Sequence, residues 1–259
     1  NFPNEILLGK YSSYPFDGKL DDFRIYNRAL TQDEVHVLYT QSAPDYNFYN
    51  ETTDMLAWYK FDDNFNDSSY NLGTMAVSDL SKFDFSSIMK SGSKSLEIKS
   101  SLANAYILSS SNNYFTPTND FSVAFWCYIV DNSAFEMLMT TRDTEVTDKG
   151  GWSILVAPGR KIFAETYKTS GAKQSGRDYI VDVGWVHISF VLNYNSATSS
   201  SFSLYLNGIL QTPSANQDGD IYCQQYSSSL DDEGNILYIG TDRDGTTLPC
   251  DTGTKFDDV

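Results

Sequence analysis

The sequence predicts an all-β protein in which two antiparallel sheets pack as a sandwich, with one short helix. Three observations support this fold class. Many short segments alternate apolar and polar residues, as half-buried strands do. Aromatic residues make up 15% of the chain, and flat side chains suit the pleated surface of a sheet. Clear signals for the start of a helix occur in one segment, so the remaining core must come from strands.

The predicted helix begins after Thr31 and runs for two or three turns. Thr31 can accept a hydrogen bond from the first free amides while the Glu34 side chain reaches back, which is a capping box. Apolar residues follow at Val35 and Leu38. Residues 41–47 then have the composition of a linker and indicate a boundary.

Beyond this boundary the pattern is one of successive strands. Asn207 and Gly208 lie between two apolar runs and predict a two-residue hairpin, because both residues tolerate the positive φ of a type I′ turn. A turn at residues 157–160 contains Pro and Gly and separates two other strands. The expected strands are residues 95–99, 120–129, 152–156, 161–166, 185–192 and 202–206.

One motif occurs twice. Residues 19–23 read Lys-Leu-Asp-Asp-Phe, and residues 255–259 read Lys-Phe-Asp-Asp-Val. A similar apolar segment ending in Gly precedes each copy, so we expect a tandem array. In this hypothesis residues 1–45 are the closing strands and helix of an upstream unit, residues 46–53 are a linker, and residues 54–259 form a sandwich truncated before its last strand. Alternatively, residues 1–45 supply the strand that completes this sandwich, or that of a neighbour in a fibre.

Several stretches share their residues with one family. Ala57–Asp63 is followed by an Asn-Asp-Ser-Ser turn, and Asp21–Leu30 ends a unit with Asp-Asp-Phe-Arg-Ile-Tyr-Asn-Arg-Ala-Leu. The others are Phe121–Trp126, Gly184–Ile188 and Leu204–Gly208. Together they resemble the laminin G-like, concanavalin A-like jelly-roll family. The resemblance implies a two-sheet sandwich that is usually secreted, often within adhesion or matrix proteins, and that in many relatives binds carbohydrate, protein or calcium.

Charge and termini restrict the partners. The formal net charge of −16 repels phosphate backbones, so nucleic acid is not expected. No run of about 18 apolar residues is present, so we expect no membrane insertion. The chain opens with Asn1 and no basic leader, which favours a processed or internal piece of a longer protein.

Cysteines and sequons favour an extracellular or cell-surface location. Cys223 and Cys250 could form a disulfide in an oxidising compartment, whereas Cys127 lies in an apolar strand and is expected to be a buried free thiol. Asn50 and Asn66 begin glycosylation sequons that are usable only on a secretory route.

Calcium is the expected cofactor, if any is bound. Its ligands would be carboxylates that converge from loops. The first and last strands of the sandwich could bring together acidic side chains from both ends of the unit. Asp21 and Asp22 could take the place of Asp257 and Asp258 if the upstream piece completes the fold. The alternative is that these side chains cap turns. The candidate ligands are Asp62, Asp63, Asp67, Asp257 and Asp258.

Glycans are a second possible partner, because aromatic platforms beside polar groups hold sugars. The candidate residues are Trp152, Tyr167, Tyr179 and Tyr226. For each of them, a place at the end of a strand in the core is the competing interpretation.

Catalysis is not expected. The Glu-x-Asp-x-x-Glu strand of glucanases with this fold is missing, and acids such as Glu165 and Asp178 are expected on loops. The two histidines are His36 in the helix and His187, which matches the family's Trp-His position and is expected to make a structural hydrogen bond. We therefore predict a non-enzymatic structural or adhesion module, a repeat of a large surface or filament-forming protein whose partners are other copies or neighbouring domains. A calcium-dependent lectin is the alternative, and a glycoside hydrolase is a third.

Overall fold

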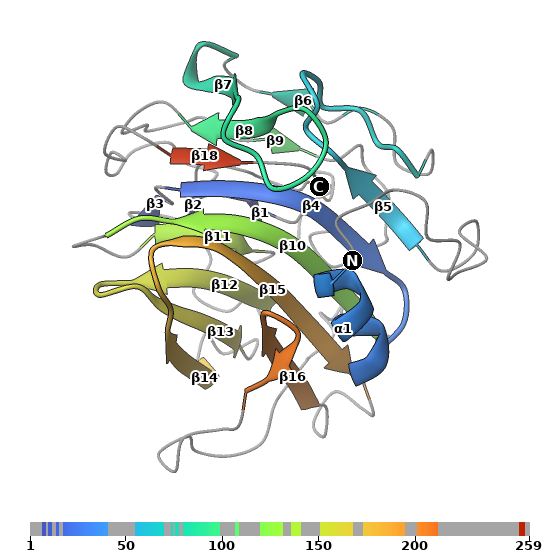
Figure 1. Ribbon diagram of the computed structural model, residues 1–259. Helices are drawn as coiled ribbons and strands as arrows, with labels where there is room; N and C mark the ends of the chain where they lie inside the picture. The colour runs from blue at the N-terminus through green and yellow to red at the C-terminus, as the bar shows by residue number, and fades with distance from the viewer. Residues whose placement is uncertain are drawn as a thin grey trace, which may run out of the picture.

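The computed structural model describes the strands, the helix and several of their connections. The described residues are 18–40, 55–69, 80–98, 120–131, 136–140, 151–167, 173–194 and 201–211, with short pieces at 7–8, 10–11, 14–15, 74, 76–77, 107–108 and 254–256. They form two large sheets and one small sheet, so the predicted fold class is confirmed (Figure 1). None of the described helices is long and apolar enough to cross a membrane.

The larger sheet has nine strands in the order β17-β16-β15-β10-β4-β8-β18, with β5 paired to β4 and β7 paired to β8. Its strands are β4 (Gly18–Tyr26), β5 (Met55–Tyr59), β7 (Phe83–Ser86), β8 (Ser95–Ile98), β10 (Phe121–Ile129), β15 (Gly184–Asn193), β16 (Ser201–Leu206), β17 (Ile209–Leu210) and β18 (Thr254–Phe256).

The second sheet has seven strands in the order β14-β13-β12-β11-β3-β2, with β1 paired to β11. Its strands are β1 (Leu7–Leu8), β2 (Lys10–Tyr11), β3 (Tyr14–Pro15), β11 (Glu136–Thr140), β12 (Gly151–Ala157), β13 (Lys161–Tyr167) and β14 (Lys173–Ile180). Strands β6 (Ala76–Val77) and β9 (Ile107–Leu108) pair separately, and a 3₁₀ turn covers Leu80–Lys82.

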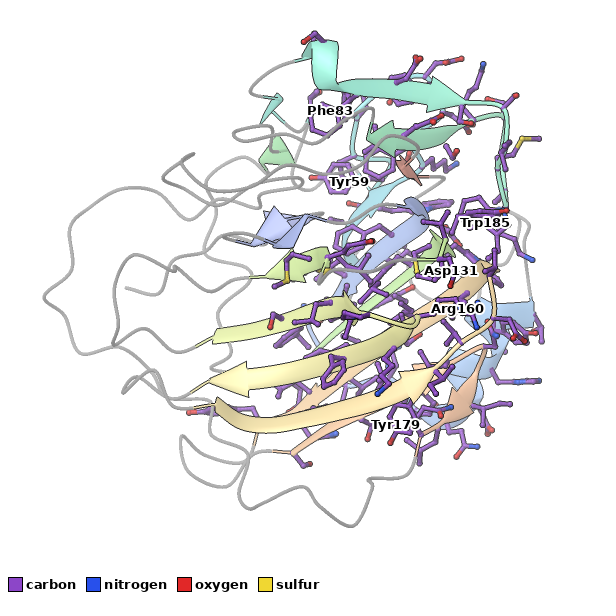
Figure 2. The ribbon with its side chains drawn as sticks, turned by 90° about the vertical axis from the view of Figure 1, so that its left-hand side faces the viewer. Tyr59, Phe83, Asp131, Arg160, Tyr179 and Trp185 are labelled. Carbon is purple, nitrogen blue, oxygen red and sulfur yellow. The ribbon has the colours of Figure 1, made fainter. Side chains whose placement is uncertain are left out.

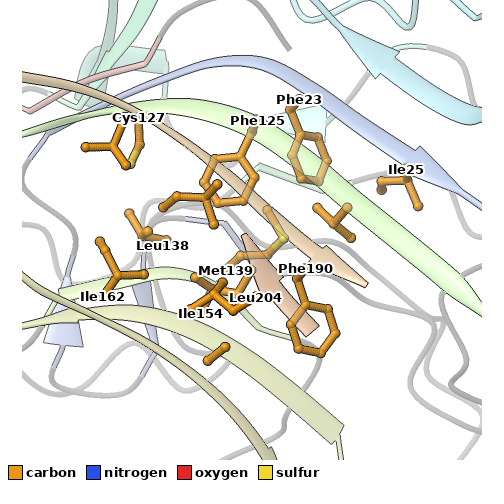
Figure 3. Close-up of a cluster of buried hydrophobic side chains, with 14 of the residues drawn as sticks. Phe23, Ile25, Phe125, Cys127, Leu138, Met139, Ile154, Ile162, Phe190 and Leu204 are labelled. Carbon is orange, nitrogen blue, oxygen red and sulfur yellow. The ribbon is translucent and has the colours of Figure 1, made fainter. Parts of the chain in front are cut away.

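The main core lies between the two large sheets. Alternate residues of β10 and β15 point into it, and Phe23 of β4 packs against Phe125 of β10 with ring centroids 5.8 Å apart. Leu138 and Ile162 enter the same core from the seven-stranded sheet (Figure 3). This burial of apolar area is the main force that holds the layers together.

Helix α1 (Gln32–Thr40) covers the other face of the nine-stranded sheet, which we call its outer face (Figure 1). Val35 and Leu38 pack there in a second cluster with Ala124, Val191 and Tyr205. Both faces of β10 are therefore buried, which is why eight of the nine residues in its burial pattern are buried.

The local signals at the helix start and at the hairpin are confirmed. Glu34 N donates to Thr31 Oγ1 at 3.3 Å, and Thr31 N donates to Glu34 Oε2 at 2.7 Å. Asn207 and Gly208 have φ values of 51° and 73° between β16 and β17, which is the backbone of a type I′ turn.

Strand β4 lies inside the nine-stranded sheet. It pairs antiparallel with β10 from Tyr26 opposite Ser122 to Gly18 opposite Ile129, and Phe23 pairs with Tyr59 of β5. The division into residues 1–45, 46–53 and 54–259 stays a prediction, and residues 46–53 lie outside the described part of the chain.

Candidate functional site

The outer face of the nine-stranded sheet carries a polar cluster where β4 meets β5. We call Asp22, Arg24, Trp58 and Lys60 the Asp22–Trp58 cluster. Arg24 pairs directly with Trp58, so the two side chains lie on the same face of the sheet. Asp22 has a φ of 52°, close to a bulge in the β4–β10 pairing between Ala124 and Trp126.

Asp22 is the centre of this cluster. Its Oδ1 accepts a hydrogen bond from Trp58 Nε1 at 2.8 Å and forms an ion pair with Arg24 Nη2, also at 2.8 Å. Arg24 and Lys60 lie over the Trp58 ring at 4.9 and 4.1 Å from its centre. Burial raises the pKa of the Asp22 carboxyl, while Arg24, Trp58 and Lys60 oppose that rise. The cluster connects β4 to β5, and the Asp22 carboxylate is bound by the protein's own side chains.

A second group lies beside it on the outer face. Trp126 of β10 pairs with His187 of β15, and their rings lie 5.0 Å apart. Tyr39 of α1 covers both rings at 5.8 and 6.3 Å, and Lys90 Nζ lies 4.2 Å above Trp126. We call these four residues the Trp126–His187 group.

The environment of His187 makes it unsuited to acid–base work near neutral pH. Burial, with the nearby charges of Arg24 and Lys90, lowers its pKa to about 3, so the imidazole is neutral at pH 7. The expected structural hydrogen bond is absent at Nδ1, which has no partner. The backbone of His187 is bonded to Asn207: His187 N donates to Asn207 Oδ1 at 3.0 Å, and Asn207 N donates to His187 O at 2.8 Å. The ring packs against Trp126 and Tyr39.

The acidic residues proposed as calcium ligands serve other purposes where the structure describes them. Asp67 Oδ1 accepts from Trp58 N at 2.9 Å and Ser69 N at 2.8 Å. Asp62 Oδ1 accepts from Ser93 N, Ser93 Oγ and Lys94 N. Asp63 is exposed.

Asp62 and Asp67 each accept backbone N–H groups through Oδ1, as the alternative of a turn-binding role describes. Their assignment as calcium ligands stays a prediction. Within the described part of the chain, no group of three His, Cys, Asp or Glu residues could hold a metal ion. Asp257 and Asp258 lie outside the described residues, so a site formed with them stays a prediction.

The aromatic candidates are mostly not described. Trp152 and Tyr167 lie on β12 and β13, but their side chains are outside the described part, as is all of Tyr226. Tyr179 of β14 is partly buried and packs against the main core, which agrees with the core interpretation.

The structure describes some of the cysteines and glycosylation sequons and not others. Cys127 is a buried free thiol, as expected, and burial raises its pKa well above the usual value. Asn66 is exposed, and its Oδ1 accepts from Thr74 Oγ1 at 2.7 Å. Asn50, Cys223 and Cys250 lie outside the described residues.

The expectation that Glu165 and Asp178 lie on loops was wrong. Glu165 lies on β13, which is the strand expected at residues 161–166, and pairs with Gly176. Asp178 lies on β14, which was not expected, and pairs with Phe163. The sequence of β14 is too polar for the segment to be recognised as a strand. Its backbone partners come from pairing with β13.

The sequence also did not reveal a group at one end of the sandwich (Figure 2). Arg160 Nη1 lies 3.2 Å from Asp131 Oδ1, and Arg160 Nε donates to Val181 O at 3.1 Å. Tyr128 and Trp185 meet edge to face nearby at 5.5 Å. We call Tyr128, Asp131, Arg160 and Trp185 the rim group. The contacts depend on three connections far apart in the sequence.

Comparison with known proteins gives one match. A family model described as the concanavalin A-like lectin/glucanases superfamily matches residues 101–259. No curated protein and no solved structure matches the chain.

Proposed function

The chain belongs to the concanavalin A-like lectin/glucanases superfamily, and from that premise we propose that it is a non-enzymatic structural or adhesion module outside the cell. Members of this superfamily include sugar-binding proteins and enzymes, so membership alone does not decide between them. Support for the proposal comes from the contacts of the described polar side chains.

One observation carries the proposal: the buried carboxylates at the β4–β5 junction are bound by the protein itself. Asp22 is held by Trp58 and Arg24, and Asp67 by the amides of Trp58 and Ser69. A glycosidase needs two carboxyl groups about 5–10 Å apart that face the substrate, one of them protonated. Asp22 has a raised pKa, but its oxygen faces Trp58 and Arg24 instead.

Location and partners follow from the same proposal. Laminin G-like domains are typically extracellular, and an acidic surface suits a soluble module in a larger assembly. The partners we propose are other copies or neighbouring domains of the same protein.

Hydrolysis assays test the absence of catalysis. The full chain is incubated with a panel of β-glucans and other polysaccharides, and released reducing ends are measured against heat-denatured protein. We expect equal release from both samples. Turnover that disappears in Glu165→Gln or Asp178→Asn would overturn the proposal, because these acids occupy adjacent strands.

A calcium-dependent lectin is the second candidate, and the rim group favours it. Trp185 and Tyr128 are partly exposed and lie near the Arg160–Asp131 ion pair, which offers an aromatic surface beside polar groups. A glycan array with calcium and with chelator would support this function if binding were lost in Trp185→Ala but retained in Trp58→Phe. An array with no binding would exclude the lectin for the glycans tested.

A further inference from the structure

Strands β4 and β18 are aligned on the same residues of β8. Lys19 and Lys255 both pair with Glu97, and Leu20 and Phe256 both pair with Leu96. These residues are also equivalent in the repeated motif, where Lys-Leu-Asp-Asp corresponds to Lys-Phe-Asp-Asp. Sequence repeat and structural register therefore agree: two copies of one strand fit one position.

The backbone of β8 cannot form a complete set of hydrogen bonds with both β4 and β18. A strand has two edges, and β7 also pairs with Glu97 and Leu96, through Asp84 and Phe85. Three strands thus share two edges. Strand β4 is bound more firmly to the sheet than β18, because it also pairs with β10 and β5. Among the described pairings, β18 has β8 alone.

From this shared register we infer that the β4 position is a strand-exchange site, which accepts β4 and α1 from a second copy of this chain. Strands β1 to β3 end two residues before β4 and join the other sheet through β11, so they would be exchanged together with it. The inference rests on the proposed structural function and names its partner and its binding site. An exchanged segment would make the same contacts as the segment it replaces, so the new interface needs no new surface.

Residues 18–40 are held by contacts that a second molecule can supply equally well. Leu30 N donates to Ser122 Oγ at 3.0 Å, and Ser122 Oγ donates to Arg28 O at 2.8 Å. Asp22 binds Trp58, and α1 packs on β10, β15 and β16. Each of these contacts joins residues 18–40 to residues beyond 54.

The connection to the rest of the chain allows the exchange. Residues 41–54 are a segment of about 14 residues, which can span up to ~50 Å when extended. Closing such a segment within one molecule gives an effective concentration on the order of millimolar. Exchange between molecules should therefore become appreciable when chains are concentrated or held side by side.

Cross-linking of the full chain tests the inference. Two single variants, Glu97→Cys and Lys19→Cys, are each made in a Cys223→Ser/Cys250→Ser background. They are mixed in denaturant, refolded together at increasing concentration and oxidised. We expect a covalent dimer whose yield rises with concentration and exceeds the control at least ten-fold. The control pairs Glu97→Cys with Ser201→Cys, since Ser201 is exposed on β16, at a distant place in the same sheet.

Two results would overturn the inference. The first is a dimer yield equal to that of the Ser201→Cys control at every concentration. The second is the failure of Glu97→Cys/Lys255→Cys to form a disulfide within one chain, because the shared register would then be absent. Hydrolysis of a polysaccharide by a chain that exchanges strands would refute the proposed function alone, whereas a monomer without turnover would refute the exchange alone.

Discussion

The indole nitrogen of Trp58 donates a 2.8 Å hydrogen bond to the carboxylate of Asp22. This bond connects two neighbouring strands of the nine-stranded sheet, since Trp58 lies in β5 and Asp22 in β4. Asp22 is 4% exposed, so water cannot readily replace a lost partner. A buried acceptor without its donor carries a desolvation cost of about 1–3 kcal/mol.

Trp58→Phe should therefore lower the free energy of unfolding by about 1–3 kcal/mol. The phenyl ring keeps an aromatic surface for Arg24 and Lys60 but removes the donor. Urea denaturation measures the change. Trp185→Phe is the matched control, because that ring packs edge to face against Tyr128 and should lose less. Equal losses in both variants would contradict a special role for the Asp22 bond.

His187 should make the protein acid-sensitive. Burial lowers its pKa in the folded protein to about 3 from the ordinary 6.5, so the unfolded state binds more protons between these pH values. The free energy of unfolding should fall by ~1.4 kcal/mol for each pH unit below 6.5, until about pH 3.

The variant His187→Phe should lose this part of the pH dependence while keeping its ring beside Trp126. Urea midpoints at pH 7, 5.5 and 4.5 measure the slope. His36→Gln, which removes the other histidine at an exposed helix position, is the control. A His187→Phe protein with the wild-type slope would show that this histidine does not carry the acid response.

Gly208→Ala should destabilise the protein more than Gly159→Ala. Both glycines have positive φ, at 73° and 78°, and each substitution costs about 1 kcal/mol in backbone strain. A Cβ at Gly208 would lie 3.1 Å from Tyr39 Cδ1, whereas a Cβ at Gly159 would meet nothing within 4 Å.

The extra contact should add about 1–2 kcal/mol and displace α1 from the hairpin. Thermal melts of the two variants provide the comparison. Similar melting temperatures would mean that Tyr39 moves aside without cost.

Asp67→Ala should cost about 2–3 kcal/mol, because it removes the acceptor for the amides of Trp58 and Ser69. Asp67→Asn keeps a carbonyl oxygen for these amides and should cost much less. Thermal melts with calcium and with chelator separate the two possible roles. If Asp67 were a calcium ligand, Asp67→Asn would abolish a calcium-dependent rise in melting temperature that the wild-type protein shows.

The sequence predicted those features that are encoded over a few residues. The capping box of Thr31 and Glu34 and the Asn207–Gly208 turn depend on neighbours in the chain, and both are present. The buried thiol of Cys127 follows from an apolar strand.

Features that depend on strand register were not predicted. Asp22 meets Trp58 because β4 pairs with β5 across 36 residues of sequence. Lys90 lies over Trp126 because the β7–β8 connection crosses the outer face. Neither contact has a local signal. The strand at Asp178 was missed for a related reason, since the polar sequence of β14 has no clear alternation and its place depends on the register with β13.

The place of β4 between β10 and β5 has a consequence during synthesis on the ribosome. Ile25 finds its partner Val123 only after roughly 100 more residues have been made, and at about 5–20 residues per second this takes on the order of 5–20 s. During that interval the nascent strand lacks its β10 partner and exposes its apolar face. Any chaperone that assists this protein should therefore act after β4 has emerged from the ribosome and before β10 has emerged.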